Sequence, residues 1–221
     1  AVITFPGSNC DRDAITYLRD LTNNDVLNIW HDETFIPSVD LIILPGGFSF
    51  GDYLRTGAMA SKSNIIPEVI KHANSGKFLL GICNGFQILS EIGLLKGALI
   101  QNNKLKFLGK DCFIKKKHEN KFNKLIKKDQ VLQIPVAHNE GNFYCSNDDL
   151  NYLNDEELIA FEYCMGSFSN SDANINGSIN NIAGITNEGK NVLGMMPHPE
   201  RAYQSFHTSM DGKSIIESLI S

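Results

Sequence analysis

The first hundred residues alternate between short apolar segments rich in branched side chains and amphipathic helical segments. Short, nearly continuous apolar segments are typical of strands that are buried on both faces of a parallel sheet, with helices as crossover connections. We therefore predict an α/β fold of three layers with a mostly parallel central sheet. The predicted strands are residues 2–5, 26–30, 39–44 and 77–82, and the predicted helices are residues 11–21, 67–74 and 84–94.

The second half of the chain continues with apolar segments and one long polar loop. Further strands are predicted at residues 131–137, 158–163, 182–186 and 192–196, with a short helix after Gly212 and a loop over residues 167–181. Neither an internal repeat nor a linker rich in proline, glycine or serine divides the sequence. We expect a single domain over residues 1–221.

Charge and apolar content narrow the classes of function. The formal net charge is -5, which gives no global basic field for nucleic acid, and the apolar runs are too short to cross a bilayer. Residues 104–128 nonetheless contain ten of the twenty lysine and arginine residues. This stretch is interpreted as a solvated basic face, with a docking surface for an acidic partner as the alternative.

The five cysteines are an odd number and include no Cys-x-x-Cys pair. This pattern fits neither a disulfide framework nor a zinc site, so we expect reduced thiols, no metal and a cytoplasmic location.

The strongest chemical signal is the segment GICNG, residues 81–85, between a predicted strand and a predicted helix. This is the layout of a nucleophile elbow, with Cys83 as the nucleophile and glycines that relieve crowding in a tight turn. The thiol is expected at a helix N-terminus, where the helix dipole favours a thiolate. The amide of Asn84 is expected to point to where an oxyanion forms.

A cysteine nucleophile needs a base and a group that orients the base. Two His-x-Glu segments follow predicted strands: His138 with Glu140, and His198 with Glu200. In an extended chain, residues i and i+2 point the same way, so either glutamate can hold its histidine. Spacing alone does not choose between the two pairs.

The loop PGGFSFGDY, residues 45–53, is a candidate for the rest of an oxyanion hole. Its glycines leave backbone amides free, and the amide of Gly47 or Phe48 is expected to act with that of Asn84. Gln87 lies four residues after the nucleophile, on the same helix face, and either contacts substrate or serves packing. A phosphate-binding glycine motif is not found in the sequence.

Three segments together resemble class I glutamine amidotransferases: PGGFSFGDYLR, GICNGFQIL and MMPHPER. FPGSNCDRD, GDYLR and AHNEGNFYC are similar more narrowly to the glutaminase subunits of phosphoribosylformylglycinamidine synthase. The resemblance covers residues 5–201 and implies a flavodoxin-like sheet. It also implies a catalytic triad of Cys83, His198 and Glu200. Asn139 stands where the family usually has glycine in AHGEG, which leaves the role of His138 and Glu140 open.

The resemblance further implies hydrolysis of glutamine to glutamate and ammonia through a cysteine thioester. The ammonia is expected to pass to a large synthetase subunit, joined by a small bridging subunit, that converts formylglycinamide ribonucleotide to formylglycinamidine ribonucleotide in purine biosynthesis. ATP and Mg²⁺ are expected on that synthetase, and no cofactor on this chain. Two alternatives remain: a stand-alone cysteine peptidase or γ-glutamyl hydrolase, and a non-catalytic redox or stress protein with an oxidisable Cys83.

Overall fold

The computed structural model describes residues 1–166 and 173–221. Within these residues, nine strands form one sheet in the order β2-β1-β3-β4-β11-β10-β9-β6-β7, and β5 pairs with β8 in a small separate sheet. The strands are β1 (Val2–Thr4), β2 (Asn28–Trp30), β3 (Leu41–Leu44), β4 (Phe78–Ile82), β5 (Ala98–Ile100), β6 (Leu108–Lys116), β7 (Val131–His138), β8 (Asn142–Tyr144), β9 (Ile159–Tyr163), β10 (Ile182–Thr186) and β11 (Val192–Met195). The helices are α1 (Asp11–Thr22), α2 (Ile66–Asn74), α3 (Asn84–Glu91), α4 (Asn147–Asp155) and α5 (Lys213–Ile220), with single 3-10 turns η1 (Ser49–Asp52), η2 (Ala60–Lys62), η3 (Ile179–Asn181) and η4 (Pro199–Arg201).

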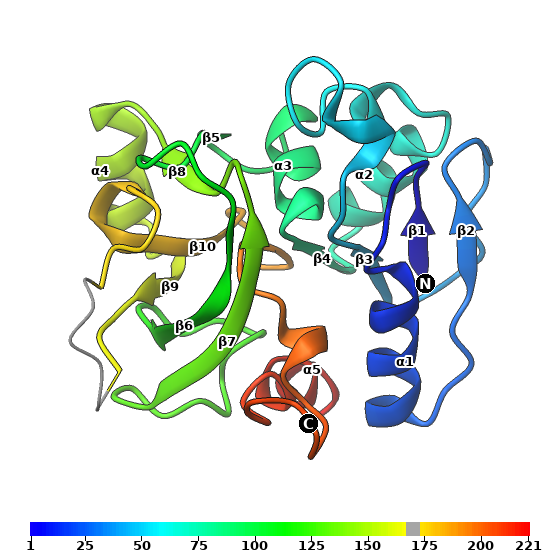
Figure 1. Cartoon of the computed structure of the whole chain (residues 1–221). Coiled ribbons are helices and arrows are strands. Elements are labelled where there is room, and N and C mark those ends of the chain that lie inside the picture. The colour runs from blue at the N-terminus through cyan, green and yellow to red at the C-terminus, as the bar shows by residue number, and fades with distance from the viewer. Residues whose placement is uncertain (167–172) are drawn as a thin grey trace.

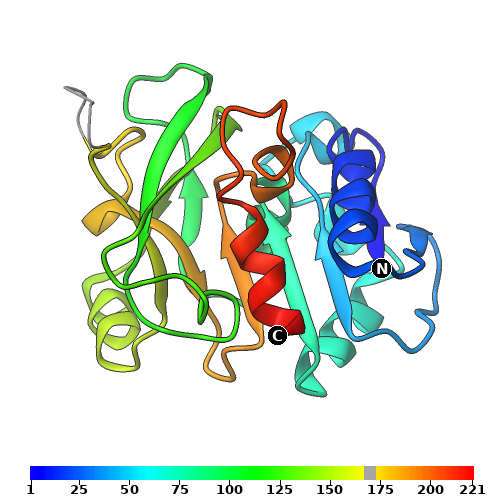
Figure 2. The same cartoon turned by 90° about the horizontal axis from the view of Figure 1, so that it is seen from below.

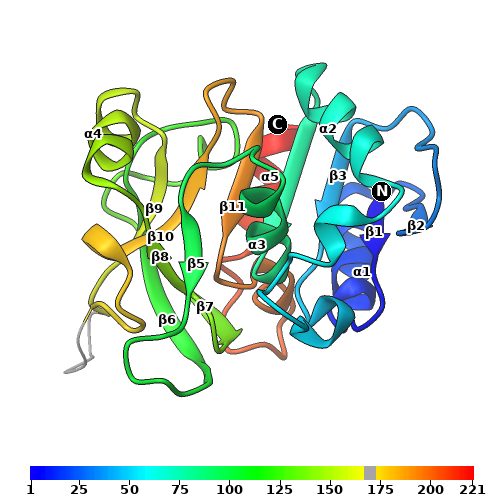
Figure 3. The same ribbon diagram turned by 90° about the horizontal axis from the view of Figure 1, so that it is seen from above.

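The strands β2, β1, β3, β4 and β11 are parallel to one another and form one half of the nine-stranded sheet. Helices α2 and α3 cover one face of these strands, and α1 and α5 cover the other (Figures 1, 2 and 3). Ile42, Ile43 and Leu44 are fully buried, as strands covered on both faces require. The predicted three-layer α/β fold is therefore confirmed.

Beyond β11, the sheet continues with antiparallel strands, β10, β9, β6 and β7. Strand β6 runs through the lysine-rich stretch, which is therefore more than a solvated face. Its alternation places Cys112 and Ile114 in the core, and Lys116 buries its aliphatic stem while its Nζ lies 3.0 Å from Glu119 Oε2. A docking role for the stretch stays a prediction.

The predicted loop at 167–181 lies partly outside the described residues, since these do not include 167–172. Its remaining part is fixed by buried polar side chains. The Asn176 side chain donates to Gly141 O at 2.7 Å, and the Ser178 hydroxyl accepts from the Phe143 amide at 3.0 Å. These bonds hold the segment after β7 in place.

The parallel strands bring four separate segments to one edge of the sheet. Strands β1, β3, β4 and β11 are neighbours and point the same way, so the residues that follow them converge beyond their carboxyl ends. Among the described residues, no helix is both long and apolar enough to span a membrane.

Candidate active site

Cys83 occupies a strained turn between β4 and α3, with φ 52° and ψ -105°. The glycines on either side make this turn possible. A Cβ at Gly85 would lie 2.0 Å from Leu44 O, and a Cβ at Gly81 would lie 2.5 Å from Leu89 Cδ1. Backbone strain of this kind persists where the surroundings impose it, and it is common at reactive residues. The structure thus forms the predicted elbow.

The surroundings of Cys83 hold its thiol at the edge of the sheet. Its amide donates to Met195 O on the neighbouring strand at 2.8 Å, and its Sγ lies 3.6 Å from Ala137 O. Because Asn84 is the first residue of α3, its amide is free of the helix ladder, and it has no acceptor among the described residues. A free amide beside the sulfur is suited to bind an oxyanion.

His198 and Glu200 form a buried pair directly after β11. The His198 amide is fixed by Pro135 O at 2.8 Å, and its Nδ1 donates to Glu200 Oε1 at 2.7 Å. Both side chains are 1% exposed. Burial lowers the pKa of His198, but the Glu200 carboxylate, followed by Cys83 and Cys10, outweighs it and holds the pKa well above its ordinary value. The imidazole is therefore placed to carry and deliver a proton next to Cys83.

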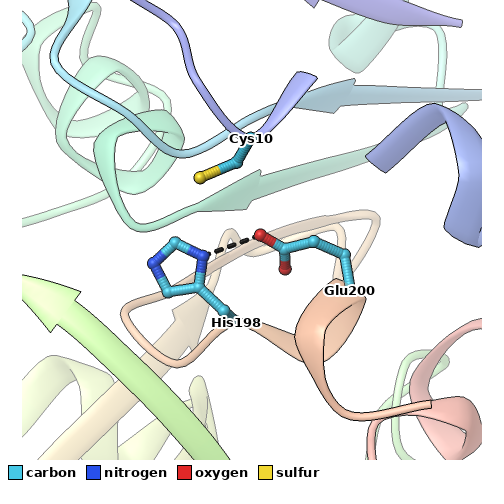
Figure 4. A group of neighbouring side chains, drawn as sticks. All are labelled: Cys10, His198 and Glu200. Carbon is cyan, nitrogen blue, oxygen red and sulfur yellow. Dashed lines mark hydrogen bonds and ion pairs between the residues drawn. The ribbon is translucent and has the colours of Figure 1, made fainter. Parts of the chain in front are cut away.

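A second thiol, Cys10, lies against the same pair and was missed by sequence reasoning (Figure 4). Ligand atoms of Cys10, His198 and Glu200 all lie within 4.8 Å of one another. Burial raises the pKa of the Cys10 thiol, which donates to Asn9 Oδ1 at 3.1 Å. The available signal was the position of Cys10 shortly after the first strand, but spacing does not relate it to a histidine so far along the chain.

Gly46 leaves room for the imidazole. A Cβ at this position would lie 2.6 Å from His198 Cε1 and 3.1 Å from Cys10 Sγ. The first glycine of the loop after β3 is thus required by packing against the histidine.

The same loop contains both residues predicted for the second half of the oxyanion hole. The Phe48 amide donates to Gly7 O at 3.0 Å and is already engaged. Gly47 has φ 134°, a conformation that favours glycine, and its amide has no acceptor in the part of the chain that is described. The geometry therefore favours Gly47 over Phe48 as a donor.

Gln87 connects three parts of the site. Its Oε1 accepts from Asn84 Nδ2 at 2.8 Å, and its Nε2 donates to Glu140 O at 2.6 Å. The Asn84 side chain also accepts from the Ser49 amide at 3.2 Å. Because Gln87 uses both ends of its amide in these contacts, it ties the elbow helix to the segment after β7.

The second His-x-Glu segment is arranged differently from the first. Glu140 accepts from Thr56 Oγ1 at 2.7 Å, whereas His138 donates from Nδ1 to Asn102 Oδ1 at 3.1 Å. Burial, with a smaller contribution from His198, lowers the pKa of His138 to about 3, so its imidazole is neutral. His138 and Glu140 therefore do not form a histidine–carboxylate pair, and Asn102 was not anticipated from the sequence.

Comparisons with known proteins agree with this geometry. Residues 1–218 match the family described as the CobB/CobQ-like glutamine amidotransferase domain. Two relatives described as phosphoribosylformylglycinamidine synthase subunit PurQ are each 48% identical. The Pelagibacter ubique protein aligns over 100% of this chain and 97% of its own length, and the Synechocystis protein over 98% of each.

Solved structures give the same result. A chain in the structure of PurLQS from Thermotoga maritima is 39% identical, with a TM-score of 0.85 over 99% of this chain and 95% of that one. A glutamine amidotransferase from Thermotoga maritima shares only the fold, with 17% identity and a TM-score of 0.58 over 91% of this chain and 75% of that one. The chain belongs to the CobB/CobQ-like glutamine amidotransferase family, within which it is similar to PurQ subunits of phosphoribosylformylglycinamidine synthase.

Proposed function

We propose that this chain is the glutaminase subunit of a phosphoribosylformylglycinamidine synthase, with Cys83 as nucleophile and His198 and Glu200 as the rest of the triad. The observation that carries the proposal is the buried His198–Glu200 pair, which directly follows β11, the strand beside the elbow strand β4. The names of the two 48% identical relatives support the reaction.

In the first half of the reaction, the Cys83 thiolate attacks the side-chain amide carbon of glutamine. The negative oxygen of the tetrahedral intermediate is bound by the free amides of Asn84 and Gly47. His198, as an imidazolium, donates its proton to the nitrogen while the carbon–nitrogen bond breaks, and ammonia leaves. The product on the enzyme is a γ-glutamyl thioester at Cys83.

In the second half, water replaces the sulfur. Neutral His198 takes a proton from the attacking water, the carbon–sulfur bond breaks, and glutamate leaves with the new oxygen. The histidine is again protonated beside the thiolate. Glu200 stabilises this protonated form throughout, because its carboxylate lies 2.7 Å from Nδ1.

The partners follow from the chemistry of ammonia and from the relatives. Ammonia reacts as the neutral molecule, so it is best transferred inside a complex without release to water. We assign its use to a large synthetase subunit, with a small bridging subunit, which a likeness to a chain in a structure of PurLQS supports. ATP and Mg²⁺ are assigned to that synthetase, and the triad itself needs no cofactor.

Two further expectations are part of this proposal. The family match over residues 1–218 supports treating the chain as one amidotransferase domain. The five cysteines are free thiols, which supports a location in the cytoplasm.

The test replaces Cys83 by alanine in the reconstituted complex with its synthetase. We expect glutamine-dependent synthesis to be lost while synthesis from free ammonium continues. The matched control is Cys164→Ala, a free cysteine outside the site, which should keep both activities. Glutamine-dependent synthesis by the Cys83→Ala complex would refute the assignment of Cys83 as the nucleophile. Full glutaminase activity of the isolated chain would instead favour a stand-alone hydrolase.

A further inference from the structure

We propose that Cys10, His198 and Glu200 form a binding site for a zinc ion, which inhibits the enzyme from within its catalytic centre. The site itself rests on the geometry of these three side chains. The inhibition rests in addition on the proposed function, because two of the three ligands belong to the proposed triad.

The three side chains are the ligand types that zinc prefers. Zinc is bound by cysteine thiolate, imidazole nitrogen and carboxylate oxygen, and sites with three protein ligands keep the fourth position open. One such atom from each of Cys10, His198 and Glu200 lies within 4.8 Å of the other two. Zinc–ligand bonds of about 2.0–2.3 Å require spacings somewhat shorter than this limit, which small side-chain movements supply.

An unsatisfied carboxylate oxygen is the second observation that points to an ion. Glu200 is 1% exposed, and its Oε2 has no hydrogen-bond partner among the described residues. A buried carboxylate oxygen without a donor is unfavourable. The adjacent cation, Arg201, does not relieve it, since its guanidinium is held 3.0 Å from Asp13 Oδ2. A divalent cation that both oxygens of Glu200 contact would satisfy the carboxylate.

The charges balance when zinc binds. Starting from the imidazolium form of His198, the ion displaces the proton of the Cys10 thiol and the proton that His198 Nδ1 donates to Glu200, so two protons leave as two positive charges arrive. Bonds form from Sγ, Nδ1 and the two carboxylate oxygens to the ion. The imidazole keeps its remaining proton on Nε2. The buried site therefore gains no net charge, which keeps the cost of burying the ion low.

Zinc in this position stops catalysis for two reasons. With its proton held on Nε2 and Nδ1 bound to the ion, His198 can no longer accept a second proton. Glu200 is bound to the ion and no longer stabilises an imidazolium. Because all three ligands are at most 2% exposed, zinc must enter through transient openings. The inhibition is expected to develop slowly and to be reversed by a chelator.

The first experiment measures the site without any activity. Cobalt(II), which replaces zinc and gives a near-ultraviolet charge-transfer band when bound to a thiolate, is titrated into the reduced, isolated chain. We expect the band to saturate at one equivalent, and zinc to displace it. The band should persist in Cys83→Ala and Cys164→Ser. It should be lost in Cys10→Ser, whose zinc affinity should fall by at least about tenfold.

The outcomes separate the candidate thiols. A band that persists in Cys10→Ser, or that disappears in Cys83→Ala, would overturn the proposal, as would the absence of a band in the parent chain. Circular dichroism and thermal unfolding of each variant establish that it folds. Cys10→Ala provides a second variant without a ligand at this position, and His198→Ala removes another ligand and should also lose the band.

The second experiment measures inhibition in the reconstituted complex. Zinc is expected to inhibit synthesis from glutamine but not from ammonium, and the glutamine-dependent activity that Cys10→Ser retains should resist zinc by at least about tenfold. Equal inhibition of both syntheses would contradict the proposed inhibition. If the cobalt band depends on Cys10 but the complex shows no glutamine-dependent synthesis, the ion site is supported. In that case it is the proposed glutaminase function that is contradicted.

Discussion

His198 Nδ1 lies 2.7 Å from Glu200 Oε1, and both side chains are almost completely withdrawn from water. A charged pair at this distance, in a medium of low dielectric constant, interacts far more strongly than an exposed pair. The ring also lies close to Cys10 and to Gly46, where an added Cβ would be 2.6 Å from His198 Cε1. The orientation of the imidazole is therefore set by several elements that come together only in the folded chain.

Replacing Glu200 by glutamine tests this pair. The amide keeps the size of the side chain but removes the negative charge that raises the pKa of His198. We expect glutamine-dependent synthesis by the complex to fall by about 100-fold, with little change in ammonium-dependent synthesis. Glu217→Gln on α5 is the control, since that carboxylate is exposed and should be dispensable. An unchanged rate from glutamine in Glu200→Gln would show that the carboxylate has no part in catalysis.

The site could be predicted from sequence only where its residues are neighbours in the chain. Cys83 was identifiable because the elbow needs glycines two residues away on either side, and the His-x-Glu spacing marked two candidate bases. The choice between them depends on the folded structure, in which Glu140 contacts Thr56 and not His138.

Cys10 could not be identified in advance for the same reason. Its relation to His198 is made by β1 and β11, which lie on either side of β3 and β4 in the sheet. No spacing in the sequence expresses that order of strands.

Gly46→Ala should impair catalysis through packing alone. The added Cβ would lie 2.6 Å from His198 Cε1, so the imidazole must move. Because displacement of a catalytic group by about 1 Å can reduce the rate roughly 100-fold, we expect a loss of that size in glutamine-dependent synthesis. Gly109→Ala is the control, since its Cβ would meet only the exposed ring of Phe107, at 3.2 Å. Equal activities of the two variants would contradict the steric role of Gly46.

The environment of Asp52 leads us to predict that the free energy of unfolding depends on pH. Burial, followed by repulsion from Glu140, raises the pKa of Asp52 from 3.8 to about 6. The folded chain thus binds this proton more tightly than the unfolded chain, so the contribution of Asp52 to the free energy of unfolding decreases as pH rises from about 4 to about 6. Asp52→Asn removes the cost of holding an ionised carboxylate at this position in the folded chain. After allowance for solvent screening of a half-buried carboxyl, we expect a gain of about 1 kcal/mol at pH 7 relative to pH 4.

The measurement is urea unfolding of the parent and of Asp52→Asn at several pH values. Asparagine also tolerates the positive φ of 53° at this residue, which adds an offset independent of pH. The informative quantity is therefore how the difference in free energy of unfolding between the parent and Asp52→Asn changes with pH. Asp129→Asn at an exposed position should show no such change. A difference that is constant from pH 4 to 7 would rule out a raised pKa at Asp52.

The fold was predictable in its parallel half and less so elsewhere. Buried parallel strands such as β3 and β4 are apolar throughout, so they stand out from the helices between them. Strand β6 was hidden because its lysines lie on both faces, and two of them, Lys110 and Lys116, share the face of the core residues. Strands β5 and β8 have three residues each and pair only with each other, which is too short for a recognisable period.

The backbone conformation of Cys83 leads to a prediction about stability that is independent of catalysis. At φ 52° and ψ -105°, a residue with a Cβ is strained, by about 1–3 kcal/mol, whereas glycine is not. We expect the free energy of unfolding of Cys83→Gly to exceed that of Cys83→Ala by about 1 kcal/mol in urea unfolding. Elsewhere the order is reversed: at Ser90, within α3, alanine should be more stable than glycine by about 1 kcal/mol. If alanine is also the more stable at position 83, the elbow imposes no strain, and the glycines beside it need another explanation.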